Sequence, residues 1–260
     1  MDKTLFMSVG VQGMDCWLRV NQLTLCLVKS GRDLRLPVHE FIQQGANRIE
    51  LWPVQSSASG LHLFKAAFSA RVQLELVKDR GPGQLVQAVP ISGFKVDIQP
   101  GELRSLSAPV LDEQVDLPVQ FPRWRFLDLQ GEPNVQTDQV RIVRFIHQLS
   151  GLFAAGQVDA LLPWFSHRNR ELMLAYNLDV QDAFEQFRNH LKWLCTECEL
   201  VADALDPELW QLKCSPRAPI YSLFSTDGTS VLQFLHAESR RRFQLPVHVA
   251  VLNDDVFVVR

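Results

Sequence analysis

The sequence predicts an α+β protein, in which an N-terminal antiparallel β-sandwich is followed by a lobe of helices and an antiparallel sheet. Up to about residue 129, short β-prone runs are separated by turn residues, and no long segment has a helical period. Beyond residue 136 apolar residues recur at helical spacing, and after Pro207 the strand pattern returns, which is typical of the α+β class. The polar segment 130–136 contains Gly and Pro, so we expect two domains, residues 1–130 and 137–260.

The first half is expected to consist of strands joined by turns that Gly and Pro favour. Turn sequences occur at residues 29–31 (Lys-Ser-Gly) and 79–83 (Asp-Arg-Gly-Pro-Gly). In the run 70–78 apolar and polar residues alternate, which is typical of a strand with one face in water. The expected strands are residues 5–11, 17–20, 23–28, 48–52, 62–68, 71–77, 94–98 and 124–128.

The second half is expected to open with four helices. Thr137 or Asp138 is suited to cap the first helix, which ends at Gly156, and Asp179 is suited to cap the fourth, which runs to about Leu200. Helices over residues 159–165 and 166–177 lie between them. The strands expected after Pro207 are residues 210–214, 220–224, 231–236, 242–252 and 256–260, with hairpin turns at 226–228 and 253–255.

Residues 36–53 combine a proline at the start of a short helical turn, Gly45 past its end, and Ile49 and Leu51 alternating with charged residues. This stretch resembles part of the galactose-binding-like jelly-roll modules, in which a short turn leads through Gly-x-Asn into a core strand. Because the motif is structural, the resemblance implies a β-sandwich and says almost nothing about sugar.

The second half opens with an amphipathic helix, continues as Ala154-Ala-Gly-Gln-Val-Asp-Ala-Leu-Leu162 with Phe165, and closes with a long hairpin ending at Arg260. This order resembles the cone-shaped NTF2-like fold, although such folds place a strand where residues 171–176 have a helical pattern here. The overall order of a β-sandwich and then a helix-plus-sheet lobe resembles uncharacterised bacterial proteins that accompany type VI secretion effectors. That layout implies an immunity or effector-loading role.

Composition excludes several classes of partner. The 260 residues include 26 Lys and Arg against 29 Asp and Glu, so the net charge of -3 gives no general attraction to nucleic acid or to an anionic membrane. The N-terminal segment has no secretory-signal pattern, and no apolar run approaches the roughly 18 residues that span a bilayer. Five cysteines, an odd number, favour reduced thiols, and together these features predict a cytoplasmic protein.

Catalytic motifs are missing from the sequence. There is no Gly-x-Ser-x-Gly, no glycine-rich loop followed by Lys-Ser or Lys-Thr, and no His-Glu-x-x-His. We therefore expect binding rather than catalysis, with no cofactor and no catalytic residue to name.

Cys195 and Cys198 form a Cys-x-x-Cys pair near the end of the fourth helix of the second half. A redox pair belongs at a helix N-terminus, where the helix dipole lowers the thiol pKa. The apolar stripe expected to be buried on this helix is Val180, Phe184, Phe187, Leu191, Leu194, Cys195 and Cys198. We therefore expect packed core thiols. A zinc site completed by His190 or Cys214 is the alternative, and the sequence has no second such pair to support it.

His248 lies in an apolar strand, on the face opposite Val247 and Val249. If the NTF2-like resemblance holds, its imidazole is a candidate general base inside the cone, oriented by Asp254 or Asp206. A hydrogen-bonded or exposed strand histidine is the favoured interpretation, because the sequence fixes no partner.

Two groups of basic and aromatic residues are candidate binding residues. Arg240 and Arg242 belong to an Arg-Arg-Arg run and share one face in a strand period; a solvated, aggregation-resistant edge is the alternative. Arg123, Trp124 and Arg125 mix arginine with an aromatic ring, the composition of interface hot spots, but Trp124 also fits a buried strand.

The strand expected over residues 242–252 and its partner 256–259 are apolar on both faces. A sheet of this kind must be covered on both sides, and the helices of one lobe cover one side. The other side is expected to meet the first lobe, a second copy of the chain in a homodimer, or a different protein.

These observations predict a non-catalytic protein-binding protein, and the layout adds an immunity or effector-loading adaptor role with a toxin, effector or chaperone as partner. The first alternative is a small-molecule isomerase or hydrolase with a pocket around His248. The second is a carbohydrate-binding module, which requires Trp17, Trp52 or Trp124 to be exposed on a flat face.

Overall fold

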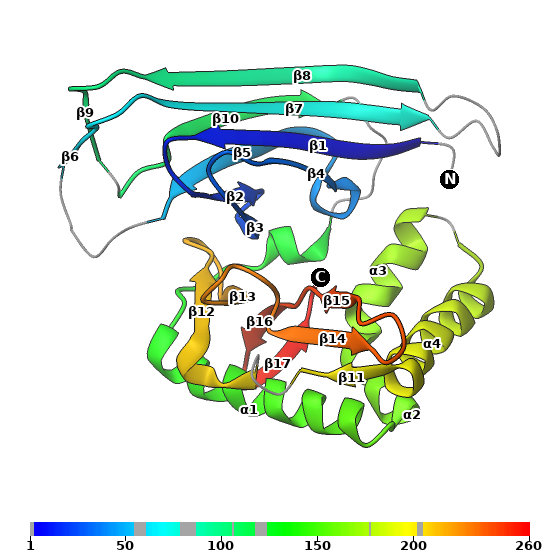
Figure 1. Cartoon of the computed structure of the whole chain (residues 1–260). Helices are drawn as coiled ribbons and strands as arrows, with labels where there is room; N and C mark the ends of the chain where they lie inside the picture. The colour runs from blue at the N-terminus through cyan, green and yellow to red at the C-terminus, as the bar shows by residue number, and fades with distance from the viewer. Residues whose placement is uncertain are drawn as a thin grey trace. The chain divides into compact units, whose positions relative to one another are not determined.

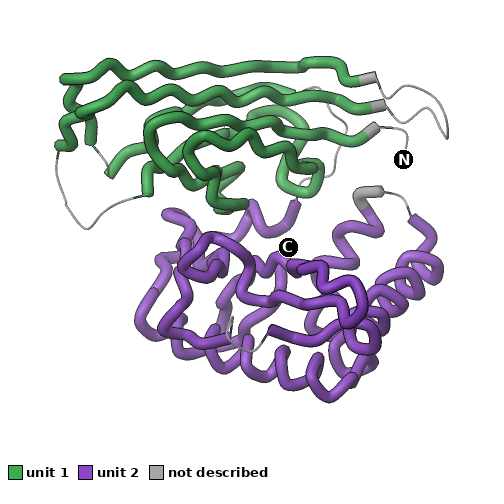
Figure 2. Tube along the Cα trace, viewed as in Figure 1, with its two compact units in different colours: residues 1–121 green, residues 122–260 purple. Residues whose placement is uncertain are grey.

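The computed structural model describes residues 3–54, 61–78, 87–105, 107–117, 124–176, 178–201 and 205–260. The chain divides into two compact units, Met1–Phe121 and Pro122–Arg260, coloured separately in Figure 2. The polar segment 130–136, where the sequence places the domain boundary, lies within the second unit. The protein has the α+β architecture that the sequence predicts, with strands in unit 1 and helices plus sheets in unit 2 (Figure 1).

Unit 1 contains two four-stranded antiparallel sheets, ordered β4-β1-β7-β8 and β10-β5-β2-β3, and a two-stranded sheet of β6 and β9. Alternate residues of both four-stranded sheets enter one hydrophobic core, so the unit is a β-sandwich. The strands are β1 (Lys3–Gln12), β2 (Cys16–Val20), β3 (Leu23–Val28), β4 (Asp33–Pro37), β5 (Gly45–Pro53), β6 (Leu61–Leu63), β7 (Phe68–Lys78), β8 (Gln87–Ile98), β9 (Leu103–Ser105) and β10 (Leu111–Leu117).

The predicted alternation in β7 is confirmed for its first part. Val72 and Leu74 are buried in the core, whereas Arg71 and Gln73 are exposed on the other face. An irregularity in the pairing of β7 with β8 between Leu74 and Glu75 disturbs the alternation beyond that point.

The segment between β4 and β5 explains why the sequence has glycine and asparagine there. The 3-10 helix η1 (His39–Phe41) ends before Gly45, whose φ of 81° favours glycine. The buried Asn47 side chain accepts a hydrogen bond from the Gln43 amide and donates to the Gln43 and Gly45 carbonyls, at 2.8, 2.8 and 2.9 Å. The Gly-x-Asn sequence therefore stabilises the entry into a core strand.

Three predictions for the first 130 residues are wrong. Strands β4, β9 and β10 were not expected, because β4 and β9 are short and β10 carries three acidic residues among its apolar ones. The single strand expected over 62–68 is not formed: β6 ends at Leu63, and β7 begins at Phe68. Residues 124–128 form the 3-10 helix η2 (Arg125–Asp128) in place of a strand.

Unit 2 contains two antiparallel sheets, ordered β11-β14-β15 and β12-β13-β16-β17, and helix α1 packs against strands of both (Figure 1). Its helices are α1 (Val135–Ala154), α2 (Val158–Leu161), the 3-10 helix η3 (Leu162–Phe165), α3 (Ser166–Tyr176), α4 (Val180–Glu197) and the 3-10 helix η5 (Pro207–Leu209). Its strands are β11 (Cys198–Leu200), β12 (Trp210–Cys214), β13 (Ile220–Ser225), β14 (Leu232–His236), β15 (Arg242–Leu245), β16 (His248–Leu252) and β17 (Asp255–Val258).

The four predicted helices are present with three changes. The fourth was expected to run to about Leu200, but α4 ends at Glu197 and the next three residues form β11. Asn134 caps α1, in place of Thr137 or Asp138: its side chain accepts from the Thr137 amide, while Asp138 accepts from the Asn134 amide at 3.2 Å. The predicted helix 159–165 is divided into α2 and η3, and Pro163 is one of the first residues of η3. Asp179 caps α4 as expected. None of the helices among the described residues is long and apolar enough to cross a membrane.

The long strand expected over 242–252 is wrong. The chain forms β15 and β16, which belong to different sheets, with Pro246 and Val247 between them. Proline has no amide hydrogen to donate to a ladder, so Pro246 favours a break at this position. The single long strand is therefore absent, but β13 and β16 are buried along both faces, and the expected homodimer or other partner stays a prediction. The predicted turn between β16 and β17 is confirmed, with positive φ at Asn253 and Asp254.

Candidate functional site

Trp124, one of the predicted binding residues, belongs to a buried cluster in unit 2, whereas Arg125 is exposed and contributes only its backbone amide. The guanidinium carbon of Arg260 lies 4.2 Å from the centroid of the Trp124 ring, and its Nη1 donates to Glu171 Oε2 at 2.8 Å. The Arg125 amide donates to the other oxygen of the Glu171 carboxylate at 2.7 Å. Trp124 is buried, so its ring is not available at the surface. Arg123 lies outside the described residues.

His248 is buried as well, and its partner differs from the expected ones. Its Nδ1 lies 2.8 Å from the Ser222 hydroxyl, whereas Asp206 caps η5 and Asp254 pairs with Arg141. Burial, with a smaller contribution from Arg260, lowers the pKa of His248 to about 3. A serine next to a histidine has the chemistry of a nucleophile and its base. Both residues are at most 2% exposed, and an imidazole with this low pKa is a weak base at neutral pH.

Arg240 and Arg242 lie on the outer side of the β11-β14-β15 sheet. Arg240 has a φ of 54° in the turn after β14 and forms an ion pair of 3.6 Å with Glu199 of β11. Arg242 begins β15 and donates to Gln233 at 3.4 Å. These contacts fit exposed side chains at the end of a sheet, and the ion pair offsets part of the positive charge.

Cys195 and Cys198 are half-buried at the end of α4 and the start of β11, where they pack against the unit-2 core. Burial raises the pKa of both thiols, which disfavours the thiolate needed for redox chemistry or metal binding. Among the described residues, no group of three or more His, Cys, Asp or Glu side chains is placed to hold a metal ion.

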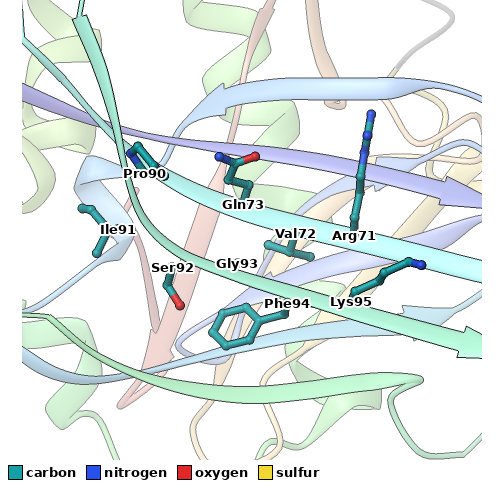
Figure 3. Close-up of a pocket in the computed structure, with 9 residues that line it drawn as sticks. All are labelled: Arg71, Val72, Gln73, Pro90, Ile91, Ser92, Gly93, Phe94 and Lys95. Carbon is teal, nitrogen blue, oxygen red and sulfur yellow. The ribbon is translucent and has the colours of Figure 1, made fainter.

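The outward face of the β4-β1-β7-β8 sheet is hollowed. A shallow depression of about 450 Å³ follows β7 and β8, and Arg71, Gln73 and Lys95 project from the sheet beside it (Figure 3). The charges on this face are balanced, because Arg71 pairs with Asp33 at 2.6 Å and Lys95 with Asp97 at 2.8 Å. The tryptophans that a carbohydrate site needs do not supply a flat exposed ring: Trp17 is 5% exposed, and Trp52 is half-buried with Arg19 over its ring.

A group of exposed apolar side chains lies where α3 ends and α4 begins. We call it the helical tip, and it consists of Leu174, Leu178, Val180 and Phe184. These side chains are 65%, 47%, 66% and 43% exposed, although large apolar residues are usually buried. Four such residues within eleven positions form a local concentration, and exposed apolar groups of this kind mark interaction surfaces.

The helical tip continues the stripe by which α4 enters the core. Val180, Phe184, Phe187, Leu191 and Leu194 repeat at helical spacing and share one face of α4. In the second half of the helix that face is covered: Leu191 is 0% exposed, and Phe187 contacts Phe165 of η3 with ring centroids 5.4 Å apart. In the first turns the face is open, which contradicts the expectation that the whole stripe is buried.

The chain segment that contains the helical tip is acidic, and an arginine stands at each end of it, Arg170 and Arg188. Residues 171–187 contain four acidic residues and no Lys, Arg or His. One of them, Glu171, is bonded to Arg260. The carboxylates of Asp179, Asp182 and Glu185 take part in none of the ion pairs between described residues. At helical spacing, however, Asp182 and Glu185 project from the side of α4 away from Val180 and Phe184, so the apolar face itself is not bordered by their carboxylates.

A second exposed apolar group is found in unit 1. Leu61, Leu63 and Leu103 are 70%, 48% and 58% exposed, and Leu63 pairs with Leu103 across the β6-β9 sheet. Both strands adjoin residues outside the described ranges, at 55–60 and at Leu106. The surroundings of these leucines are therefore incompletely described. The helical tip also adjoins a residue outside the described ranges, Asn177, but Val180 and Phe184 lie in α4, all of which is described.

No protein family, curated protein or solved structure matches the chain. The assignment of a function therefore rests on the residues themselves.

Proposed function

We propose that the protein is non-catalytic and binds another protein through the helical tip. The observation that carries this proposal is the exposure of Val180 and Phe184, two members of a stripe that forms core elsewhere in the same helix. Exposed apolar side chains cost solvation free energy, and a partner that covers them recovers it.

The chemistry of the remaining candidates supports binding over catalysis. His248, the best candidate for a general base, is 2% exposed, and its low pKa leaves it a weak base. The immunity or effector-loading role is a more specific form of the same proposal, in which the bound protein is a toxin, an effector or a chaperone.

Affinity purification from the cells that produce the protein tests the proposal. Wild-type protein is compared with Val180→Ser/Phe184→Ser and with Val140→Ser, a matched control, because Val140 is 62% exposed on α1 of the same unit. We expect a protein that co-purifies in stoichiometric amount with the wild type and with Val140→Ser and is lost with the double variant. A partner retained by the double variant, or turnover of a small molecule without any partner, would contradict the proposal.

A further inference from the structure

The outward face of the β4-β1-β7-β8 sheet has a second hollow, which lies over β1 and which we call the β1 hollow. Its volume is about 380 Å³, and the polar residues that line it are Ser8, Asp33, Arg35, Arg71 and Gln73. We propose that the β1 hollow binds a small zwitterion, a molecule with one ammonium and one carboxylate group such as a free amino acid. The hollow belongs to unit 1, so this inference is independent of the function proposed for the helical tip.

One end of the β1 hollow is bounded by an ion pair that crosses β1 above Gly10. Strands β4 and β7 flank β1, and both Asp33 of β4 and Arg71 of β7 lie directly opposite Gly10. Arg71 Nη2 donates to Asp33 Oδ2 at 2.6 Å. Gly10 is buried beneath this pair, and a Cβ there would collide with the Asp33 carboxylate. The glycine therefore allows the ion pair to lie across the strand.

The other end is bounded by a second ion pair, which crosses β1 above Phe6. Arg35 of β4 donates from Nη2 to Glu75 Oε2 of β7 at 3.3 Å, and its guanidinium carbon lies 4.5 Å from the centroid of the Phe6 ring. Ser8 lies on β1 between the two crossings, opposite Arg35 on one side and Gln73 on the other. Its small side chain leaves the space between the two ion pairs open.

The charges around the β1 hollow alternate in sign. Asp33 and Arg35 project from the same face of β4, about 6.6 Å apart along the strand. On β7, Arg71 pairs with Asp33 and Glu75 pairs with Arg35, so two cations and two anions cancel. A ligand with a net charge would meet a like charge beside each opposite one. A zwitterion can place its ammonium next to Asp33 and its carboxylate between the two arginines, which is why we infer this class of ligand.

The side chains around the hollow keep hydrogen-bonding capacity for a ligand. A guanidinium has five N–H donors and a carboxylate has two oxygens, and each of the two printed bonds across β1 uses one N–H and one oxygen. The exposed Gln73 amide projects from the same side of β7 as Arg71 (Figure 3), and it can both donate and accept. Because the ion pairs already hold the charged side chains, less conformational entropy is lost when a ligand binds.

NMR titration of the isotope-labelled full chain with three related molecules tests the proposal. At about pH 6.5, where α-amino groups are mostly protonated, L-serine is a zwitterion, N-acetyl-L-serine is an anion and L-serine amide is a cation. The backbone amide signals of β1 and β7 are followed in the wild type and in Arg71→Ala, Ser8→Leu and Lys95→Ala. Lys95→Ala is the matched control, because the Lys95 and Arg71 side chains are both 70% exposed and each pairs with one aspartate.

We expect L-serine to shift the amide signals of Ser8 and Gln73 with a dissociation constant of about 1 mM, since the hollow is open to water. Both charged analogues should bind at least about tenfold more weakly. Arg71→Ala removes a partner of the carboxylate and Ser8→Leu fills the hollow, so each should weaken L-serine binding by about tenfold or more. Lys95→Ala should leave the affinity within about twofold of the wild type.

Three results would overturn the inference. The first is the absence of any shift of these signals with L-serine at about 50 mM. The second is binding of N-acetyl-L-serine as tight as that of L-serine, which would show a site for anions. The third is an equal loss of binding in Lys95→Ala and Arg71→Ala, which would show a general effect of surface charge. If Ser8→Leu fails to fold, Arg71→Ala still decides, and none of these results bears on the helical tip in unit 2.

Discussion

The two halves of α4 carry the same apolar stripe in different surroundings. In the second half Leu191 and Leu194 are at most 2% exposed, whereas in the first half Val180 and Phe184 are 66% and 43% exposed. Helix α3 shows the opposite distribution, because it places the carboxylate of Glu171 inside the unit and the apolar Leu174 in solvent. The difference teaches that periodicity defines a face of a helix, while the neighbouring elements decide how much of that face becomes core.

The largest effect on stability is expected from Glu171→Ala, which tests the buried polar side of α3. The Arg260 side chain is 1% exposed and would lose its carboxylate partner, so we expect the free energy of unfolding to fall by about 3–5 kcal/mol. Urea-induced unfolding measures the change, and Leu174→Ala on the exposed side of α3 is the control, with a change within about 0.5 kcal/mol. Equal effects of the two substitutions would contradict the described polarity of α3.

Leu191→Ala tests the covered half of the α4 stripe. Its side chain is fully buried in the unit-2 core, so we expect a loss of about 2–5 kcal/mol from removed contacts and the cavity left behind. The measurement is urea unfolding followed by circular dichroism at the helical band. A loss below about 1 kcal/mol would mean that this half of the helix is no better packed than the other.

Asp179→Ala tests how the open half of α4 is held. The Asp179 carboxylate accepts hydrogen bonds from the Gln181 and Asp182 amides at 2.9 and 3.0 Å, so we expect a loss of about 1 kcal/mol. Asp179→Asn keeps an acceptor at the same position and should lose less. If both variants were as stable as the wild type, the first turn of α4 would not depend on its cap.

The smallest effect is expected at the helical tip itself. Val180→Ser/Phe184→Ser removes apolar surface that is largely in water already, so the free energy of unfolding should fall by no more than about 1 kcal/mol. The same denaturation experiment, with Val140→Ser beside it, makes the comparison. A loss as large as that of Leu191→Ala would show that the tip belongs to the core and has no face free for a partner.

Patterns within one element could be predicted from the sequence. The helical period located α1 and α4, and Asp179 was identified as the cap of α4. Alternation of apolar and polar residues predicted most strands of unit 1. It did not predict β10, because Asp, Glu and Gln residues separate its three buried positions. The break between β15 and β16 was missed because apolar residues continue through Pro246, although proline cannot donate a ladder hydrogen bond.

The candidate site could be predicted only in part, because it depends on distant segments. The sequence identified the face of α4 that contains Val180 and Phe184, but not that its cover begins only at Phe187, since that cover includes Phe165 of η3. Trp124 and Arg125 were chosen for their composition, and no local pattern connects them with Glu171 and Arg260. The exposure of Val180 and Phe184 has no local signal in the sequence, because the same apolar spacing continues into the buried half of α4.

Photo-crosslinking in the cells that produce the protein tests the central claim most directly. A benzophenone amino acid is placed at position 180 in one variant and at position 140 in another, two positions with 66% and 62% exposure. We predict that position 180 yields a discrete adduct with one other protein and that position 140 does not. Adducts of equal yield at both positions, or at neither, would contradict the assignment of the helical tip as the binding surface.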